Sequence, residues 1–86
     1  MPRISQFFGI VIAMYYRDHA PPHFHAAYSG FEAAITIAGP HVMEGKLPKR
    51  VLSLVVEWAR LHRKELLVDW DLARRALPLK SIAPLE

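Results

Sequence analysis

The sequence predicts an α+β fold in which a small antiparallel sheet of three to four strands is packed on one face by two C-terminal helices. Residues 7–46 form short apolar runs separated by Gly and Pro turns, a pattern typical of strands. From Pro48 onward the apolar side chains recur at the spacing of an amphipathic helix. With 86 residues, the chain has room for a single domain, residues 1–86, around one core.

Composition places the chain among compact globular proteins, because 52% of its residues are hydrophobic and 22% are charged. The absence of cysteine excludes disulfides and a thiolate nucleophile, and it indicates a reducing compartment, the cytoplasm. The apolar run near the N-terminus is far short of the roughly 20 residues that span a bilayer, so no membrane association is expected. A net charge of +3 permits RNA binding without requiring it. A chain this small would gain stability from a partner or from forming a homo-oligomer.

The first predicted strand runs from Phe7 to Tyr16 and is apolar on both alternating faces, which is typical of a strand covered on both sides. The segment "HFHAAYSGFEAAITIAG" then predicts a hairpin around a Ser29-Gly30 turn. Gly39-Pro40 marks a second turn, which leads into a short strand over residues 41–46. The hairpin turn sets the expected cross-strand pairs, which are Tyr28 with Phe31, Ala26 with Ala33, and Phe24 with Ile35.

Pro48 suits the first position of the long helix, whose apolar stripe continues to Leu66. Asp69 is expected to cap a second, shorter helix that Pro78 ends. The remaining tail should lie extended against the body. The predicted core combines the apolar rows of the sheet with the facing stripe of the helix: Ile10, Ile12, Phe24, Ile35, Val51, Val55 and Trp58.

Three of the five histidines lie within "HAPPHFHA", residues 19–26. The two-residue period of strands places His23, His25 and Glu32 on one face of the hairpin, and Phe24, Phe31 and Ile35 on the other. Cleavage of RNA by its own 2′-hydroxyl needs a base and an acid, and an imidazole suits both roles because its unperturbed pKa is about 6.5. His23 and His25 are therefore the candidate catalytic pair, acting without a metal or other cofactor.

Cations near the histidines would contact the phosphates of such a substrate. Arg17, Lys46 and Arg50 are the candidates for this role. His19 is included as a substrate-binding candidate, although its position before the prolines and outside the strand makes it the one of the three histidines that best suits a structural role.

Two alternatives use the same histidines. His23, His25 and Glu32 could hold a metal ion, because an H-x-H strand beside a carboxylate gathers suitable ligands. The histidines could instead be structural, with hydrogen bonds that shape the Pro-Pro turn. His41 and His62 are assigned structural roles.

The segments "MPRISQFFGIVIAMYYRDHAPPHFHAAYSGFEAAI", "EGKLPKR", "EWARLHRKELLVDW" and "PLKSIAPL" together resemble a small bacterial domain-of-unknown-function family, family 4160. The resemblance implies a bacterial protein encoded beside another short protein in a type II toxin-antitoxin module. Together with the candidate catalytic pair His23 and His25, this context favours the toxin component, acting on RNA, with a small cognate protein as partner; the alternative is a non-enzymatic, antitoxin-like binding partner. The resemblance brings no catalytic mechanism and no site residues.

Overall fold

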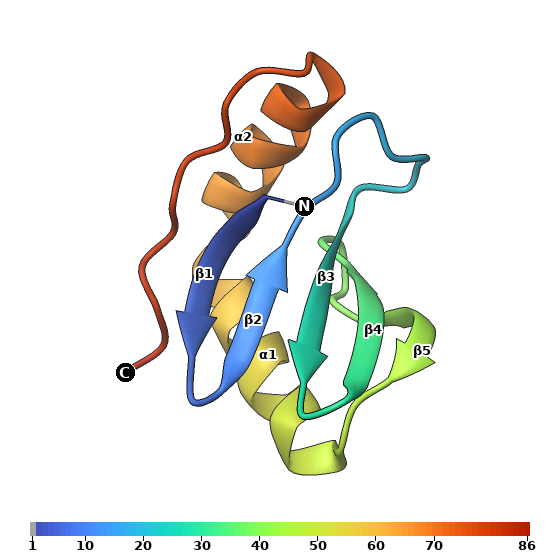
Figure 1. Cartoon of the computed structure of the whole chain (residues 1–86), viewed down its shortest axis with the longest axis vertical. Coiled ribbons are helices and arrows are strands. Elements are labelled where there is room, and N and C mark those ends of the chain that lie inside the picture. The colour runs from blue at the N-terminus through green and yellow to red at the C-terminus, as the bar shows by residue number, and fades with distance from the viewer. Residues whose placement is uncertain (1) are drawn as a thin grey trace.

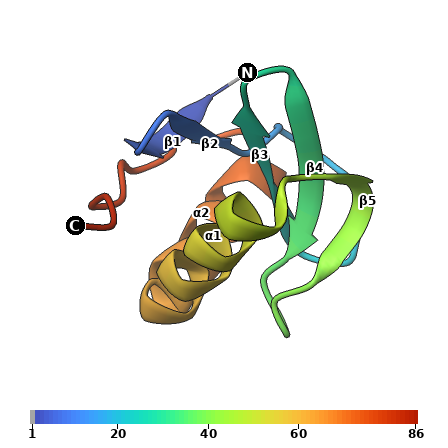
Figure 2. The same cartoon turned by 90° about the horizontal axis from the view of Figure 1, so that it is seen from below.

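A computed structural model describes residues 2–86 and has the predicted α+β architecture, with an antiparallel sheet covered on one face by two helices (Figures 1 and 2). The sheet has five strands rather than three to four, in the order β1-β2-β3-β4-β5. The elements are β1 (Arg3–Phe7), β2 (Ile10–Ala13), β3 (His23–Tyr28), β4 (Phe31–Thr36), β5 (Val42–Lys46), α1 (Lys49–Leu61) and α2 (Arg63–Arg74).

The additional strand arises because the predicted strand over residues 7–16 is wrong. The chain turns at Phe8 and Gly9, whose φ angles are 50° and 77°, and Phe7 then pairs with Ile10. Gly9 adopts this left-handed backbone without steric cost, so the chain reverses there, and residues 3–7, most of which lie before the predicted strand, pair with residues 10–13.

The hairpin β3–β4 has the predicted register, with Phe24 opposite Ile35 and Ala26 opposite Ala33. These four side chains face the helices and are buried, whereas Phe31 at the turn is exposed. All seven predicted core residues are buried, and Trp58 packs its ring against Phe7 and Phe24. The core therefore lies between the helices and the inner face of the sheet.

The boundary between the helices differs from the prediction. α1 ends at Leu61, and α2 begins at Arg63 after a non-helical His62. The prediction that Asp69 caps a helix is wrong, because Asp69 lies inside α2 and its Oδ1 accepts the backbone N–H of Lys80 at 2.9 Å. The Asp69 carboxylate thus binds a backbone N–H of the C-terminal tail, and not the N–H groups at the start of a helix.

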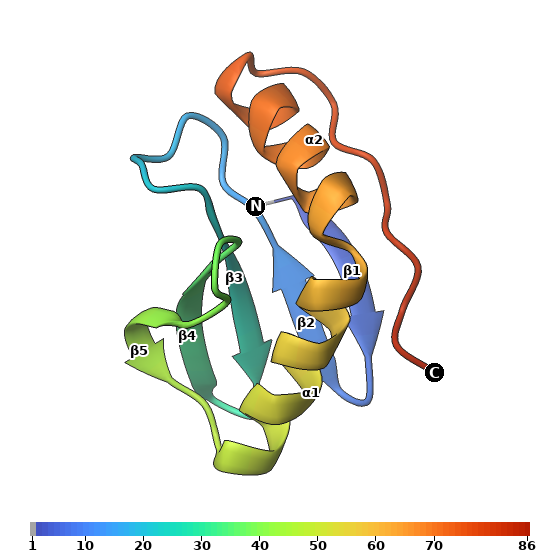
Figure 3. The same ribbon diagram turned by 180° about the vertical axis from the view of Figure 1, so that it is seen from behind.

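The C-terminal tail runs beside β1 on its way to the end of the chain (Figure 3). Ile82 donates its backbone N–H to the carbonyl of Ile4 at 2.7 Å, and the Trp58 indole donates to the carbonyl of Ala83 at 2.8 Å. These bonds hold the tail against the body of the protein. Within residues 2–86, neither helix is long and apolar enough to cross a membrane.

Candidate functional site

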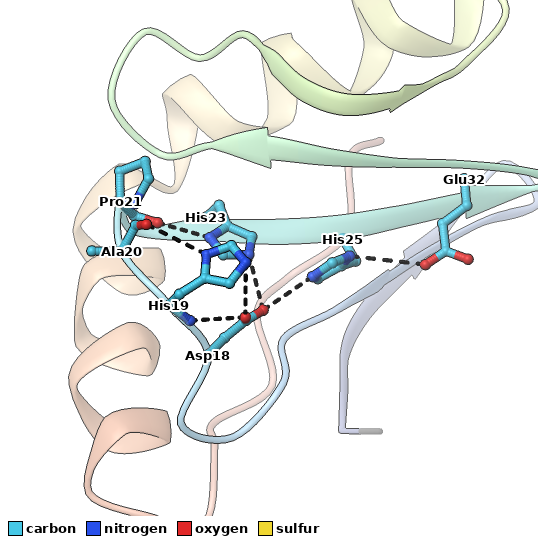
Figure 4. Close-up of polar contacts among 7 residues, drawn as sticks. All are labelled: Asp18, His19, Ala20, Pro21, His23, His25 and Glu32. Carbon is cyan, nitrogen blue, oxygen red and sulfur yellow. Dashed lines mark hydrogen bonds and ion pairs between the residues drawn. The ribbon is translucent and has the colours of Figure 1, made fainter.

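The candidate site lies where the loop between β2 and β3 folds back over the first residues of β3. Arg17 adopts a left-handed backbone (φ 54°) and donates its N–H to the carbonyl of Ala73 in α2. This bend brings the next residue, Asp18, beside the histidines of β3 (Figure 4). The carboxylate thus lies close to two side chains that are five and seven residues further along the chain.

His23 is almost fully buried, with 2% of its surface exposed, and both of its ring nitrogens face oxygen atoms. Nδ1 lies 2.7 Å from the carbonyl oxygen of Pro21, and Nε2 lies 2.9 Å from Oδ2 of Asp18. A carbonyl oxygen can only accept, so Nδ1 carries a proton and donates it. Nε2 therefore points at the carboxylate with either a second proton or a lone pair.

His25 lies two residues further along the same face of β3 and is also flanked by acidic groups. Its Nε2 lies 3.4 Å from Oδ2 of Asp18, and its Nδ1 lies 3.8 Å from Oε2 of Glu32. The ring of Tyr15 packs edge-on against the imidazole, with centroids 4.2 Å apart. Burial raises the pKa of Tyr15, and the nearby negative charge of Glu32 acts in the same direction.

Asp18 is the centre of the cluster. Burial pushes the pKa of its carboxyl group upward, but the backbone N–H of His19 and the rings of His25 and His23 together outweigh this effect. The pKa of Asp18 therefore lies below its ordinary value, and the group remains ionised at neutral pH. The site therefore places the ionised carboxylate of Asp18 beside the Nε2 atoms of His23 and His25.

A metal ion fits this arrangement. Asp18, His23 and His25 each offer one ligand atom, and the three atoms lie within 4.8 Å of one another. A groove of about 290 Å³ adjoins the cluster on the open face of the sheet. The groove exists because Ala33, Ala34 and Gly45 carry little or no side chain there, and its other lining residues are His25, Glu32 and Glu44.

The predicted substrate-binding residues do not all gather at this site. His19 stacks on His23, with centroids 5.4 Å apart, and its side chain is largely exposed. Arg17 directly precedes Asp18 in the chain, and Lys46 lies opposite Glu32 in the β4–β5 register. Arg50 instead lines a separate pocket at the start of α1.

The two histidines outside the cluster make local contacts. Nδ1 of His41 lies 3.2 Å from the hydroxyl of Thr36, and Nδ1 of His62 lies 2.6 Å from Oε1 of Glu65. Both arrangements agree with the structural roles assigned to these residues.

Asp18 is the residue that the sequence reasoning missed. It directly precedes His19 in "RDHAPPHFH", so an acidic residue next to a histidine cluster was available as an indication. Strand periodicity selected Glu32 instead, because periodicity relates residues within a hairpin and says nothing about a loop that folds back on it.

Comparison with known proteins returns a family match and no annotated relative. The model of a domain of unknown function, DUF4160, matches residues 9–71, a range that includes the whole candidate site. No curated protein and no solved structure matches the chain. The chain therefore belongs to the DUF4160 family.

Proposed function

We propose that the chain binds a divalent transition-metal ion through Asp18, His23 and His25. The observation that carries this proposal is the hydrogen bond from Nδ1 of His23 to the carbonyl of Pro21. Histidines that bind metals usually donate one ring N–H to a carbonyl or carboxylate, which leaves the other nitrogen free as a ligand. Nε2 of His23 is that other nitrogen, and it points at Asp18.

The two distances from Asp18 to the histidines suit a coordination sphere. In a tetrahedral or octahedral site with bonds of about 2.1 Å, neighbouring ligand atoms lie about 3.0 to 3.4 Å apart. Oδ2 of Asp18 lies 2.9 Å from Nε2 of His23 and 3.4 Å from Nε2 of His25. Two imidazoles and one carboxylate suit Zn²⁺ or Fe²⁺ and leave coordination positions for an exogenous ligand. The groove beside His25 gives such a ligand a path to the ion.

A proton between His23 and Asp18 would also account for the 2.9 Å contact. A proton, however, needs only two partners, whereas a metal ion needs three or more. The approach of His25 to the same carboxylate oxygen is superfluous for a proton and necessary for a metal ion. The effect of replacing His25 on metal binding therefore distinguishes a metal ion from a shared proton.

The test is titration of the metal-free protein with Zn²⁺ and, separately, with Co²⁺, whose visible absorption reports its ligands. His25→Ala is the informative variant, because His25 is less buried than His23 and its loss threatens the fold less. His62→Ala is the matched control, since His62 also lies beside a carboxylate but outside the cluster. We expect about one ion per chain for the parent and the control, and at least 100-fold weaker binding for His25→Ala.

Metal binding should also stabilise the folded protein, by about 2.7 kcal/mol when free Zn²⁺ reaches 100 times its dissociation constant. Binding should weaken in acid, because protons compete for the ligand nitrogens. A parent protein that takes up no ion, or a His25→Ala variant that binds as tightly as the parent, would contradict the proposal.

Metal-independent cleavage of RNA by His23 and His25, as a toxin, is the second candidate function. It requires each histidine to present a nitrogen to the substrate, and the burial of His23 gives this hypothesis less support than the metal site. Expression of the chain without its genomic neighbour tests it. A toxin should inhibit growth, and His25→Ala should relieve the inhibition while the protein stays folded and chelators have no effect.

A further inference from the structure

The turn between β1 and β2 carries an exposed aromatic residue in an unfavourable backbone conformation. Phe8 has a φ of 50°, in the left-handed region that a bulky residue rarely adopts, and its surface is 59% exposed. The neighbouring turn uses the small polar Ser29 in the same conformation, with a φ of 46°. Among the described residues, the one aromatic contact of Phe8 is an edge-on contact with Phe7. Neither the turn nor the core requires the ring, which indicates a role outside the fold.

Phe8 lines a pocket of about 350 Å³ at the end of the molecule opposite the Asp18 loop. The β1–β2 turn, the β3–β4 turn and the start of α1 meet at this end (Figures 1 and 3). The walls are mainly apolar and come from all three of these parts: Phe8, Ile10, Tyr28, Val51 and Leu54, together with Arg50.

The charge at the pocket is positive and uncompensated. Arg50 is exposed and forms no ion pair with any residue of the range 2–86. It follows Lys49 in the first turn of α1, which contains no acidic residue. Acidic residues normally stabilise this end of a helix, whereas two cations here oppose the helix dipole. A negative group supplied by a partner would remove this unfavourable arrangement.

We propose that this pocket binds an acidic peptide segment of a partner protein. An apolar side chain of the segment packs against Phe8 and Leu54, and a neighbouring carboxylate pairs with Arg50. Three of the lining residues, Ile10, Val51 and Leu54, are aliphatic and favour an apolar peptide side chain, whereas a nucleic-acid base would stack only on the rings of Phe8 and Tyr28. The pocket accepts one side chain, so the affinity of an isolated peptide should be in the micromolar range or weaker.

Fluorescence anisotropy with labelled peptides tests the proposal. The probes are four acetylated, amidated peptides in which two glutamates flank a central Leu, Ile, Phe or Met, and the same set with lysines in place of glutamates. Phe8→Asn and Arg50→Gln are the test variants. Tyr16→Asn, at the exposed aromatic residue Tyr16 after β2, and Arg60→Gln, further along α1, are the matched controls.

We expect at least one acidic peptide to bind, each test variant to weaken binding at least tenfold, and the controls to change it less than twofold. Phe8→Asn also has a stability readout, because asparagine tolerates the left-handed backbone. The melting temperature of this variant should be no lower than that of the parent and up to about 8 °C higher.

Several results would overturn the proposal. One is the absence of binding of any acidic peptide at millimolar concentration, and another is binding that neither test variant weakens. A melting temperature of Phe8→Asn well below the parent's would show that the ring supports the fold. Binding of a single-stranded oligouridine that both variants abolish, without peptide binding, would assign the pocket to nucleic acid.

Discussion

Replacement of Asp69 by asparagine should stabilise the protein at neutral pH. Asp69 is fully buried within α2, its Oδ1 accepts the backbone N–H of Lys80, and its Oδ2 has no hydrogen-bond partner within residues 2–86. Asparagine retains an oxygen for Lys80 and removes the charge. The amide NH2 of asparagine takes the place of Oδ2 in the same unpartnered position, so the gain is only the difference between burying a charged group and burying a neutral polar group, which itself costs about 1 to 3 kcal/mol. We therefore expect a gain of about 1 kcal/mol or more, or about 4 to 8 °C in melting temperature.

The gain should depend on pH in a defined direction. Burial raises the pKa of Asp69, and Glu65 adds to this effect, although the N–H and charge of Lys80 oppose it. The folded protein then holds the proton more tightly than the unfolded chain, so the stability of the parent falls as pH rises through the raised pKa. The advantage of Asp69→Asn should be largest at pH 7 and shrink toward pH 4, near the unfolded pKa of about 3.9.

Thermal unfolding followed by circular dichroism between pH 4 and pH 7.5 measures both effects. Asp71→Asn is the matched control, because Asp71 lies on the same helix but is exposed, and its loss should change the stability by less than about 0.5 kcal/mol. A variant that melts below the parent at pH 7, or an advantage that does not narrow in acid, would refute the reasoning.

Two further predictions concern the core and the sheet. Trp58→Ala should lower the free energy of unfolding by about 3 to 5 kcal/mol, because it leaves a cavity beside Phe7 and removes the indole that holds the tail. Urea unfolding at 25 °C measures this loss, and an unchanged midpoint would contradict the packing of Trp58. Gly45→Ala should cost about 2 kcal/mol or more, since Gly45 has a φ of 73° and a Cβ would lie only 2.2 Å from the carbonyl oxygen of Glu32. Gly30→Ala is the control, because Gly30 is also left-handed but a Cβ there meets no atom within 4 Å. Equal losses of stability in the two variants would show that the backbone conformation, and not a steric clash, causes the loss at Gly45.

Local patterns were sufficient for the hairpin β3–β4 and for the buried rows. The Ser29-Gly30 turn determines the register, and the two-residue period then assigns Phe24 to the core and His25 to the open face. The stripe of α1 similarly determines that Trp58 is buried. These features depend on residues close together in the chain, so their spacing carries the necessary information.

Local patterns were insufficient where an apolar run is compatible with two structures. The apolar run over residues 7–16 does not show that the chain reverses at Phe8 and Gly9, and only the pairing of β2 with residues 3–7 of β1 reveals the turn. The α1–α2 boundary and the burial of Asp69 depend in turn on the tail, which supplies the N–H of Lys80.

By itself, the sequence determined that His23 and His25 share one face of a strand, because the alternation of side chains is a property of the extended backbone. Only the tertiary structure decided what lies opposite them. Arg17 has a left-handed backbone and donates its N–H to the carbonyl of Ala73, which turns the loop back toward β3. Asp18 therefore contacts the imidazole rings of both histidines. That contact depends on the packing of α2 against the loop, and no periodicity within the loop or the strand encodes it.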